Sequence, residues 1–365
     1  MATRDATAAG PPRTGRFDSS PVRGLRTSDY DYELPRDRIA QRPVARRDAS
    51  RLLVISRADG RLEDARFAQL AERVPPGDVV VLNDTRVFPA RLVGRKPTGA
   101  RVEVLLLRPR GDRRHWSGLV RPGGKLKPGR RVVVSDELSV EVVEREGDAR
   151  VLRLDTPLDP DEALEKYGRV PLPPYVERED DAQDRERYQT VYAERAGSVA
   201  APTAGLHFTP ELLETLARRG VRLATVTLHV GVGTFRPVDS EDPAAHRMHA
   251  EPYEVAPAAA AAIEAARAQG GRVWAVGTTV TRTLESAAGP DGRVRAGAGW
   301  TRLFVRPPYR FRVVDRLLTN FHLPRSTLLM LVAAFAGYDL TMRAYAHAVA
   351  GDYRFYSYGD AMLVL

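Results

Sequence analysis

The chain has 365 residues, of which 28% are charged and 43% hydrophobic, and it carries a net charge of +9 without a single cysteine. This length allows two domains, each with a core of its own. The lack of cysteine excludes disulfides, thiolate nucleophiles and cysteine-ligated metal clusters, and it fits a reducing cytoplasm.

Residues 1–24 are rich in Ala, Gly, Pro, Arg and Ser and lack the apolar core of a secretory signal. We expect a disordered N-terminal extension. An organellar transit peptide is the alternative, although Asp5 and Asp18 interrupt its basic character. The longest apolar run, residues 327–335, is about half of the ~20 residues that cross a bilayer, so we expect a cytoplasmic protein without membrane contact.

Residues 25–75 contain a short predicted helix near 36–41 and a predicted strand at 52–55. Residues 76–156 then form a series of short β-branched runs, beginning at 79–82, with Gly and Pro between them. Short strands at this spacing are typical of a small barrel or sandwich. We therefore predict an inserted β-barrel domain over 76–156.

The predicted barrel carries the positive charge of the chain. Fourteen Lys or Arg lie between Arg86 and Arg131 against two acidic residues, so the rest of the chain is slightly acidic. A polyanion is a natural partner for such a field, because each neutralised phosphate releases counterions. A solvated basic surface is the alternative.

Residues 157–365 alternate between helical and strand patterns. Helices are predicted at 210–219, 257–269, 280–287, 326–336 and 339–350, and strands at 221–228, 272–276 and 354–358. The mixed charges of residues 177–186 indicate an exposed loop. With residues 25–75, this part is predicted to form an α/β catalytic domain whose sheet is mixed and largely parallel.

Two loops of small residues follow or precede these elements. Residues 200–209 carry His207 just before a helix, where small residues allow a ligand to approach closely and the helix N-terminus favours anions. A packed turn in which His207 caps the following helix is the alternative. Residues 227–235 leave a strand through Gly231 and Gly233; this pattern is weak by itself, but ligands gather at the ends of parallel strands.

Three further polar groups stand out. A metal site is one interpretation of the pattern formed by His246, His249 and Glu251. The prolines around these residues disfavour one long helix, so we expect acid–base or structural roles and no metal. Asp84 and Arg86 close a strand, where they could pair with each other. Residues 319–324 and 356–360 are polar loops between apolar elements.

Eight long strings occur in a characteristic order from about Asp29 to the C-terminus: DYELPRDRIAQRP, VVVLNDTRVFPARL, YQTVYAERAGSVAAPTAGLHFT, VTLHVGVGTFRPV, HRMHAEPYEV, AVGTTVTRTLES, TNFHLPRSTLLMLVAAFAG and YRFYSYGDAML. In these strings the chain resembles the S-adenosylmethionine:tRNA ribosyltransferase-isomerases of queuosine biosynthesis. The N-terminal extension is additional, and Pro308 stands before Tyr309 where Gly is expected.

The resemblance implies transfer and isomerisation of the ribosyl group of S-adenosylmethionine onto 7-aminomethyl-7-deazaguanine at the tRNA wobble position. The products are epoxyqueuosine-tRNA, adenine and methionine, and no metal or cofactor beyond the co-substrate S-adenosylmethionine is expected. A non-catalytic RNA-binding protein and a nucleotide-sugar or phosphate-ester enzyme are the competing hypotheses.

Site residues follow as hypotheses. A histidine suits removal of the proton next to the sulfonium and protonation of the departing adenine. The predicted catalytic residues are His207, His229 and His322, with Asp84 and Glu251 as carboxylate partners. The predicted S-adenosylmethionine-binding residues are Thr203, Gly205, Gly231, Gly233 and Thr278. The residues predicted to contact the tRNA anticodon stem-loop are Arg86, Arg91, Lys96, Arg121, Lys125 and Lys127.

Overall fold

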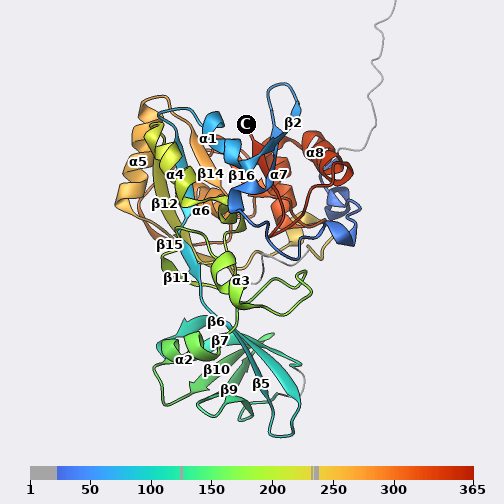
Figure 1. Cartoon of the computed structure of the whole chain (residues 1–365), viewed down its shortest axis with the longest axis vertical. Helices are drawn as coiled ribbons and strands as arrows, with labels where there is room; N and C mark the ends of the chain where they lie inside the picture. The colour runs from blue at the N-terminus through green and yellow to red at the C-terminus, as the bar shows by residue number, and fades with distance from the viewer. Residues whose placement is uncertain (1–22, 124–125, 232, 234–237) are drawn as a thin grey trace, which may run out of the picture.

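The computed structural model describes residues 23–123, 126–231, 233 and 238–365. They form a large α/β part and a separate small β-barrel, which lies at the bottom of the view in Figure 1. The predicted disorder of residues 1–24 falls almost wholly outside the described residues. Gly24, which is described, donates its backbone N–H to Asp29 Oδ2 at 2.9 Å and is therefore held in place.

A mixed sheet of nine strands forms the α/β part, in the order β15-β13-β12-β3-β14-β16-β17-β1-β2. The four central strands β12, β3, β14 and β16 are parallel to one another, and β1 is parallel to β17, whereas the remaining pairs are antiparallel. The mixed α/β fold predicted from the sequence is confirmed. The strands are β1 (Arg51–Ile55), β2 (Leu62–Arg66), β3 (Val79–Asn83), β12 (Arg222–Leu228), β13 (Glu251–Val255), β14 (Val273–Val276), β15 (Gly297–Thr301), β16 (Arg316–Asn320) and β17 (Ala361–Val364).

Helices cover both faces of this sheet, which explains why its central strands are apolar without alternation. One face packs on α5 (Pro257–Ala268), α6 (Thr278–Ala287), α7 (Thr327–Ala336) and α8 (Tyr338–Ala350). The other face packs on α1 (Leu70–Arg73) and α4 (Pro210–Arg218). All five residues of β3 are consequently buried.

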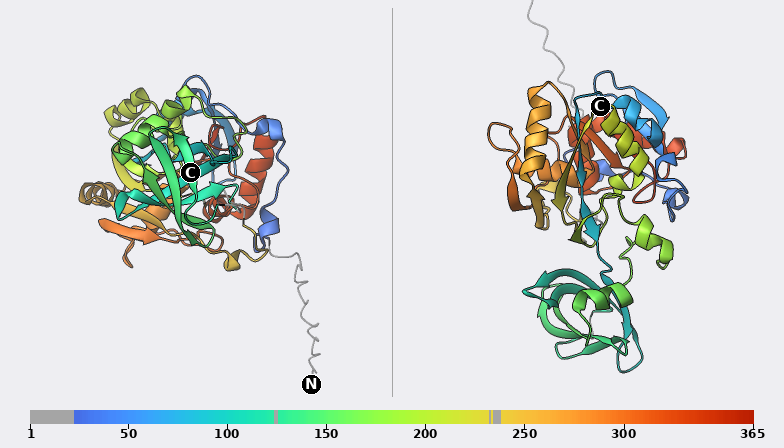
Figure 2. Two further views of the ribbon diagram at one scale, coloured as in Figure 1. Left: turned by 90° about the horizontal axis from the view of Figure 1, so that it is seen from below. Right: turned by 60° about the vertical axis from the view of Figure 1, so that its left-hand side comes forward.

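The barrel is closed by six antiparallel strands in the order β10-β7-β6-β5-β8-β9 (Figure 2). Apolar side chains alternate inward along each strand, and α2 (Pro160–Tyr167) packs on them. Gly94 allows β5 to approach β8, because a Cβ atom there would lie 2.4 Å from the carbonyl oxygen of Val133. The strands are β5 (Arg91–Arg95), β6 (Arg101–Arg110), β7 (Asp112–Arg121), β8 (Arg131–Ser135), β9 (Leu138–Glu146) and β10 (Ala149–Asp155).

Three sequence predictions need correction. β3 was assigned to the barrel, but it pairs with β12 and β14 in the large sheet, so the barrel strands begin at β5 and not near residue 76. Residues 354–358 are not a strand, because Tyr356 has φ of 71° and turns the chain; the last strand is β17. Residues 177–186 are not a simple exposed loop, since they lead into α3 (Ala182–Arg187) and bury Asp184.

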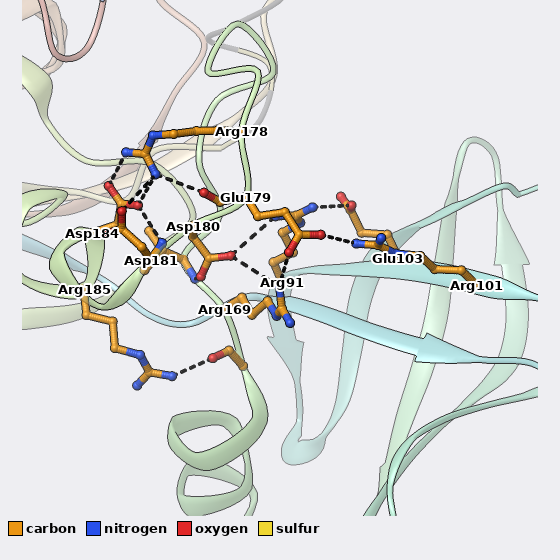
Figure 3. A network of polar contacts seen from close by, with 12 residues as sticks. Arg91, Arg101, Glu103, Arg169, Arg178, Glu179, Asp180, Asp181, Asp184 and Arg185 are labelled. Atoms are coloured by element: carbon orange, nitrogen blue, oxygen red, sulfur yellow. Dashed lines mark hydrogen bonds and ion pairs between the residues drawn. The ribbon is translucent and has the colours of Figure 1, made fainter. Parts of the chain in front are cut away.

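A network of ion pairs joins the barrel to the segment that leads back into the α/β part (Figure 3). Arg91 on β5 pairs with Glu103 at 2.9 Å and with Asp180 at 3.6 Å. Arg101 and Arg169 both pair with Glu179, at 2.8 and 3.2 Å. Short connections near Thr85–Val87 (β4) and Arg195–Ser198 (β11), which pair in parallel, complete the junction. The barrel is therefore held at a defined place by charge as well as by the chain.

Asp184 is the buried end of this network and gives a test of its strength. Its carboxylate is 1% exposed and accepts hydrogen bonds from Arg178 at 2.6 and 2.8 Å and from the Tyr358 hydroxyl at 2.7 Å. Asp184→Asn should lower the free energy of unfolding by about 3 kcal/mol, because Arg178 would lose its nearest counterion and keep only Asp181, at 3.8 Å. Urea denaturation measures this value. The matched change Asp181→Asn removes the exposed pair with Arg42 and a longer one of 3.8 Å with Arg178, and Asn can still cap α3. It should cost less than about 1 kcal/mol; equal losses would contradict the role given to Asp184.

Within the described part of the chain, no single helix is long and apolar enough to cross a membrane. The bent pair of α7 and α8, which meet at 116°, passes the same test of length and composition when the two helices are taken together.

Candidate active site

A cleft of about 560 Å³ opens at the carboxyl ends of the central parallel strands, and we call it the main cleft. Ligands of open α/β sheets bind at this edge because the loops that follow the strands converge there. Gly277, with φ of 94°, makes the sharp turn from β14 into α6 beside the cleft. The lining consists of Tyr175, Ala200, Ala201, Pro202, Thr203, Ala204, Val230, Gly277, Thr278, Thr279, Thr319, Asn320, Phe321, His322, Leu323, Leu328, Tyr356 and Ser357.

His322 is the predicted catalytic histidine that lines this cleft. Its side chain follows β16, and its Nε2 lies 2.9 Å from the Thr319 hydroxyl. Two hydrogen bonds fix the backbone of His322: its amide N–H donates to the Tyr345 hydroxyl, and its carbonyl accepts from the Tyr32 hydroxyl. Burial lowers the pKa of His322 to about 3, so the imidazole is neutral at physiological pH. A neutral imidazole can accept a proton.

His207 lies behind the cleft wall and does not line the main cleft. Its Nδ1 is 2.7 Å from the Ser50 hydroxyl and its Nε2 is 3.2 Å from Asn320 Nδ2, while its ring stacks on Phe67. Burial, assisted by the charges of Arg47 and Arg354, lowers the pKa of His207 to about 3. Both ring nitrogens are engaged in these contacts, which is typical of a residue that positions a neighbour.

The neighbour is Asn320, which sequence reasoning left among the polar loops without a role. The Asn320 side chain lines the cleft and is 2% exposed. Its Nδ2 donates to the carbonyl of Tyr356 at 3.2 Å, so the amide cannot be flipped without placing two oxygens face to face. The Oδ1 atom is left buried without a partner among the described residues. A ligand N–H or O–H in the cleft would satisfy this acceptor.

His229 and Asp84 form a second group, beside the first. His229 Nδ1 lies 2.7 Å from the Thr85 hydroxyl, and Asp84 accepts a hydrogen bond of 2.6 Å from Thr227. Burial lowers the pKa of His229 and raises the pKa of Asp84. Asp84 faces Arg195 at 4.0 Å and not Arg86, so the predicted pairing of Asp84 with Arg86 is wrong.

Glu251 connects the loop at Gly231 to Arg282, a residue that the sequence did not indicate. Its carboxylate accepts the backbone N–H of Gly231 at 2.9 Å and pairs with Arg282 on α6, which is almost fully buried. Glu251 thus fixes the loop that begins after the cleft residue Val230. Arg282 could not have been selected beforehand, because only the folded chain brings α6 next to β13.

Of the five predicted S-adenosylmethionine-binding residues, Gly231 is the one bonded to Glu251, and the other four either line the main cleft or pack against neighbours. Thr203 and Thr278 line the main cleft. Gly205 and Gly233 are instead sites of close packing: a Cβ atom would lie 2.1 Å from the Tyr192 hydroxyl at Gly205 and 2.5 Å from the His249 ring at Gly233. Within the described ranges, no group of three or more His, Cys, Asp or Glu could hold a metal ion.

Among the residues predicted to contact tRNA, Arg86, Arg121 and Lys127 are exposed and Lys96 is half-buried. None of these four forms an ion pair with a described residue. Arg91 belongs to the ion-pair network of Figure 3 and its side chain is largely covered. Lys125 lies outside the described residues.

Comparisons with known proteins identify the family. A family model described as "Queuosine biosynthesis protein" matches residues 27–364. The S-adenosylmethionine:tRNA ribosyltransferase-isomerase of Symbiobacterium thermophilum is 56% identical over 344 residues, which cover 93% of this chain and 100% of the relative. The enzyme of the same name from Magnetococcus marinus is 54% identical over 93% of this chain and 94% of the relative. The crystal structure of an S-adenosylmethionine tRNA ribosyltransferase from Thermotoga maritima is 42% identical, covers 92% of this chain and 99% of that chain, and superposes with a TM-score of 0.54.

The α/β sheet with a cleft at its strand ends, the basic barrel and these relatives together define a tRNA-modifying transferase. The chain belongs to the queuosine biosynthesis protein family, whose curated relatives are S-adenosylmethionine:tRNA ribosyltransferase-isomerases. The resemblance seen in the sequence is confirmed, and the chain is an enzyme rather than a non-catalytic RNA-binding protein.

Proposed function

We propose that this enzyme transfers and isomerises the ribosyl group of S-adenosylmethionine onto 7-aminomethyl-7-deazaguanine at the wobble position of tRNA. The products are epoxyqueuosine-tRNA, adenine and methionine, and the reaction takes place in the cytoplasm with its tRNA substrate. The observation that carries the proposal is the position of His322 in the lining of an uncharged cleft at the strand ends, in a chain whose relatives are named for these two substrates.

In the proposed reaction the main cleft holds the nucleoside part of S-adenosylmethionine. The sulfonium acidifies the adjacent 5′ carbon, and His322 takes the proton that this carbon loses. Adenine leaves with a proton, the aminomethyl nitrogen of the tRNA base forms the new bond to carbon, and the carbocycle and epoxide close as methionine departs. The free Oδ1 of Asn320 accepts a hydrogen bond from the bound nucleoside and fixes its orientation.

His229 and Asp84 remain the candidates for the acid that assists adenine departure. They lie at the ends of β12 and β3, next to Asn83, whose side chain donates to the cleft residue Thr279 at 3.2 Å. His207 supports Asn320, and Glu251 supports the loop at Gly231.

The experiment that tests the function is incubation of the purified protein with S-adenosylmethionine and an anticodon stem-loop that carries the aminomethyl deazaguanine. Mass analysis of the nucleosides should show the added carbocycle, with adenine released in equal amount. If neither appears, or if adenine is released at the same rate without RNA, the proposal is wrong.

Two cations of the barrel, the half-buried Lys96 and the exposed Lys127, provide a second prediction, on RNA binding. Lys96→Glu combined with Lys127→Glu should weaken tRNA binding at least tenfold at low salt and reduce the slope of log affinity against log salt by about 1 to 2, because two phosphate contacts are lost. Filter binding at several salt concentrations measures both values. Arg61→Glu, an exposed change on the β1–β2 hairpin, serves as the control. If affinity and slope both stay at wild-type values, the barrel surface at these lysines does not bind the tRNA.

A further inference from the structure

A second, smaller cleft of about 260 Å³ adjoins the main cleft, and we call it the arginine cleft. The two clefts share Ser357, and His207 of the arginine cleft contacts Asn320 of the main cleft. The arginine cleft is lined by Pro43, Val44, Arg47, Arg187, Leu206, His207, Ser357, Tyr358 and Gly359. The steps of the proposed reaction assign no role to Arg47 or Arg187 in this cleft.

Arg47 and Arg187 face this cleft, and among the described residues neither forms an ion pair. Arg47 donates to the carbonyls of Leu206 and Glu186 at 3.1 and 2.9 Å. Arg187 donates to the carbonyls of Val44 and Ala45 at 2.7 and 3.0 Å. Neither guanidinium forms an ion pair with a carboxylate of the described chain, and Arg187 Nε is buried without any partner there.

This arrangement differs from the rest of the same region. In the network of Figure 3, Arg91, Arg169 and Arg178 each have a carboxylate within ion-pair distance. At the arginine cleft, burial and the charge of Arg187 lower the pKa of Arg47 against the smaller opposing effect of Glu186. Burial likewise lowers the pKa of Arg354 against the effect of Asp360, and the charge of Arg354 acts on His207. Bringing like charges together in a half-buried place is unfavourable, and a bound anion would relieve it.

The main cleft lacks the positive charge that the arginine cleft has. Its described lining contains no lysine, arginine or carboxylate side chain. S-adenosylmethionine carries a carboxylate at the end of its methionyl group, and a carboxylate that leaves water needs charged or well-aimed donors. The neighbouring arginine cleft supplies such donors.

We propose that the arginine cleft is an oxyanion site in which Arg47 and Arg187 bind the methionyl carboxylate of S-adenosylmethionine, while the nucleoside occupies the main cleft. This assignment rests on the proposed function, because it takes the co-substrate from it. A backbone phosphate of the tRNA offers the same oxyanion chemistry, and the experiment separates the two sources.

Calorimetry with two ligands tests the carboxylate directly. S-adenosylmethionine and its decarboxylated analogue, which lacks only this group, are titrated into the wild type and into Arg47→Gln and Arg187→Gln. We expect each variant to bind S-adenosylmethionine about 10- to 100-fold more weakly, as for loss of a charge-assisted hydrogen bond, and to bind the analogue within about twofold of the wild type. Arg187→Lys, which keeps the charge, should recover part of the affinity.

Arg185→Gln is the matched control. Arg185 lies on the same helix α3 and also donates to two carbonyls, those of Glu165 and Gly168, but it lines neither of the two clefts. The Arg185→Gln variant should bind both ligands with the affinity of the wild type. A general loss of folding would instead weaken binding of both ligands alike, and thermal unfolding of each variant checks for it.

The tRNA arm uses the same variants without S-adenosylmethionine. If their tRNA affinity falls while S-adenosylmethionine binds normally, the oxyanion is a phosphate and the carboxylate assignment is overturned. If neither affinity changes, there is no oxyanion site. The failure of the proposed function looks different, since the wild type itself would then release no adenine and form no modified nucleoside.

Discussion

His322→Ala will lower the rate of adenine release by about 100- to 10,000-fold, the range expected for loss of a positioned general base or acid. Among the three predicted catalytic histidines, His322 is the one whose side chain lines the main cleft. The affinity for S-adenosylmethionine should change much less, since the other walls of the cleft remain. Single-turnover kinetics on the modified stem-loop, with calorimetry of S-adenosylmethionine binding, separates the two effects.

The pH dependence adds a signature to this prediction. Because burial lowers the pKa of His322 to about 3, its imidazole stays neutral from pH 8 down to about pH 5, and the wild-type rate should not fall through protonation of this residue over that range. His115→Ala, a change at an exposed histidine of the barrel, is the control and should leave the rate unchanged. A near wild-type rate for His322→Ala would remove His322 from the mechanism.

Acidification from pH 7 to 4.5 will destabilise the fold by about 5 kcal/mol through His207 and His322 together. Both have a folded pKa of about 3, below the unfolded value of 6.5. Their contribution is therefore complete above the unfolded pKa, and it is lost as the pH falls toward the folded pKa, because the unfolded chain then binds more protons.

The comparison of wild type and variant isolates this effect from other groups. Asp84 and Asp360 have pKa values raised by burial, and their contribution has the opposite dependence on pH. His207→Gln removes one of the two histidines and should reduce this loss of stability by about half relative to the wild type. Urea denaturation at both pH values gives the numbers; identical losses in the two proteins would show that His207 is protonated in the folded state.

Much of the fold follows from local patterns in the sequence. Apart from β13, which was not predicted, the α-helices and strands between residues 210 and 287 were predicted within about two residues, because caps, glycines and apolar periodicity agree there. β3 was placed in the wrong domain, since a short apolar run fits a barrel strand and a buried parallel strand equally well, and only pairing with β12 and β14 decides. The predicted strand over residues 354–358 failed at Tyr356, whose positive φ is imposed by its tertiary surroundings.

The site was less predictable, because its selection depends on contacts that are distant in sequence. Residue type and the loop string identified His322, but Asn320 gains its role from the Tyr356 carbonyl, 36 residues later. Arg91 and Arg187 are alike in the sequence. The folded chain gives Arg91 the carboxylates of Glu103 and Asp180 and leaves Arg187 bonded only to carbonyls.

The position of β17 has a consequence for how the chain is made. This strand comprises residues 361–364 and lies between β16 and β1, so it joins the first strand of the chain to the central ones. Because β17 follows the other described strands in chain order, the α/β sheet cannot be completed before residues 361–364 have been synthesised. The barrel, whose strands all lie between residues 91 and 155, has no such restriction and can fold while the rest of the chain is still being translated.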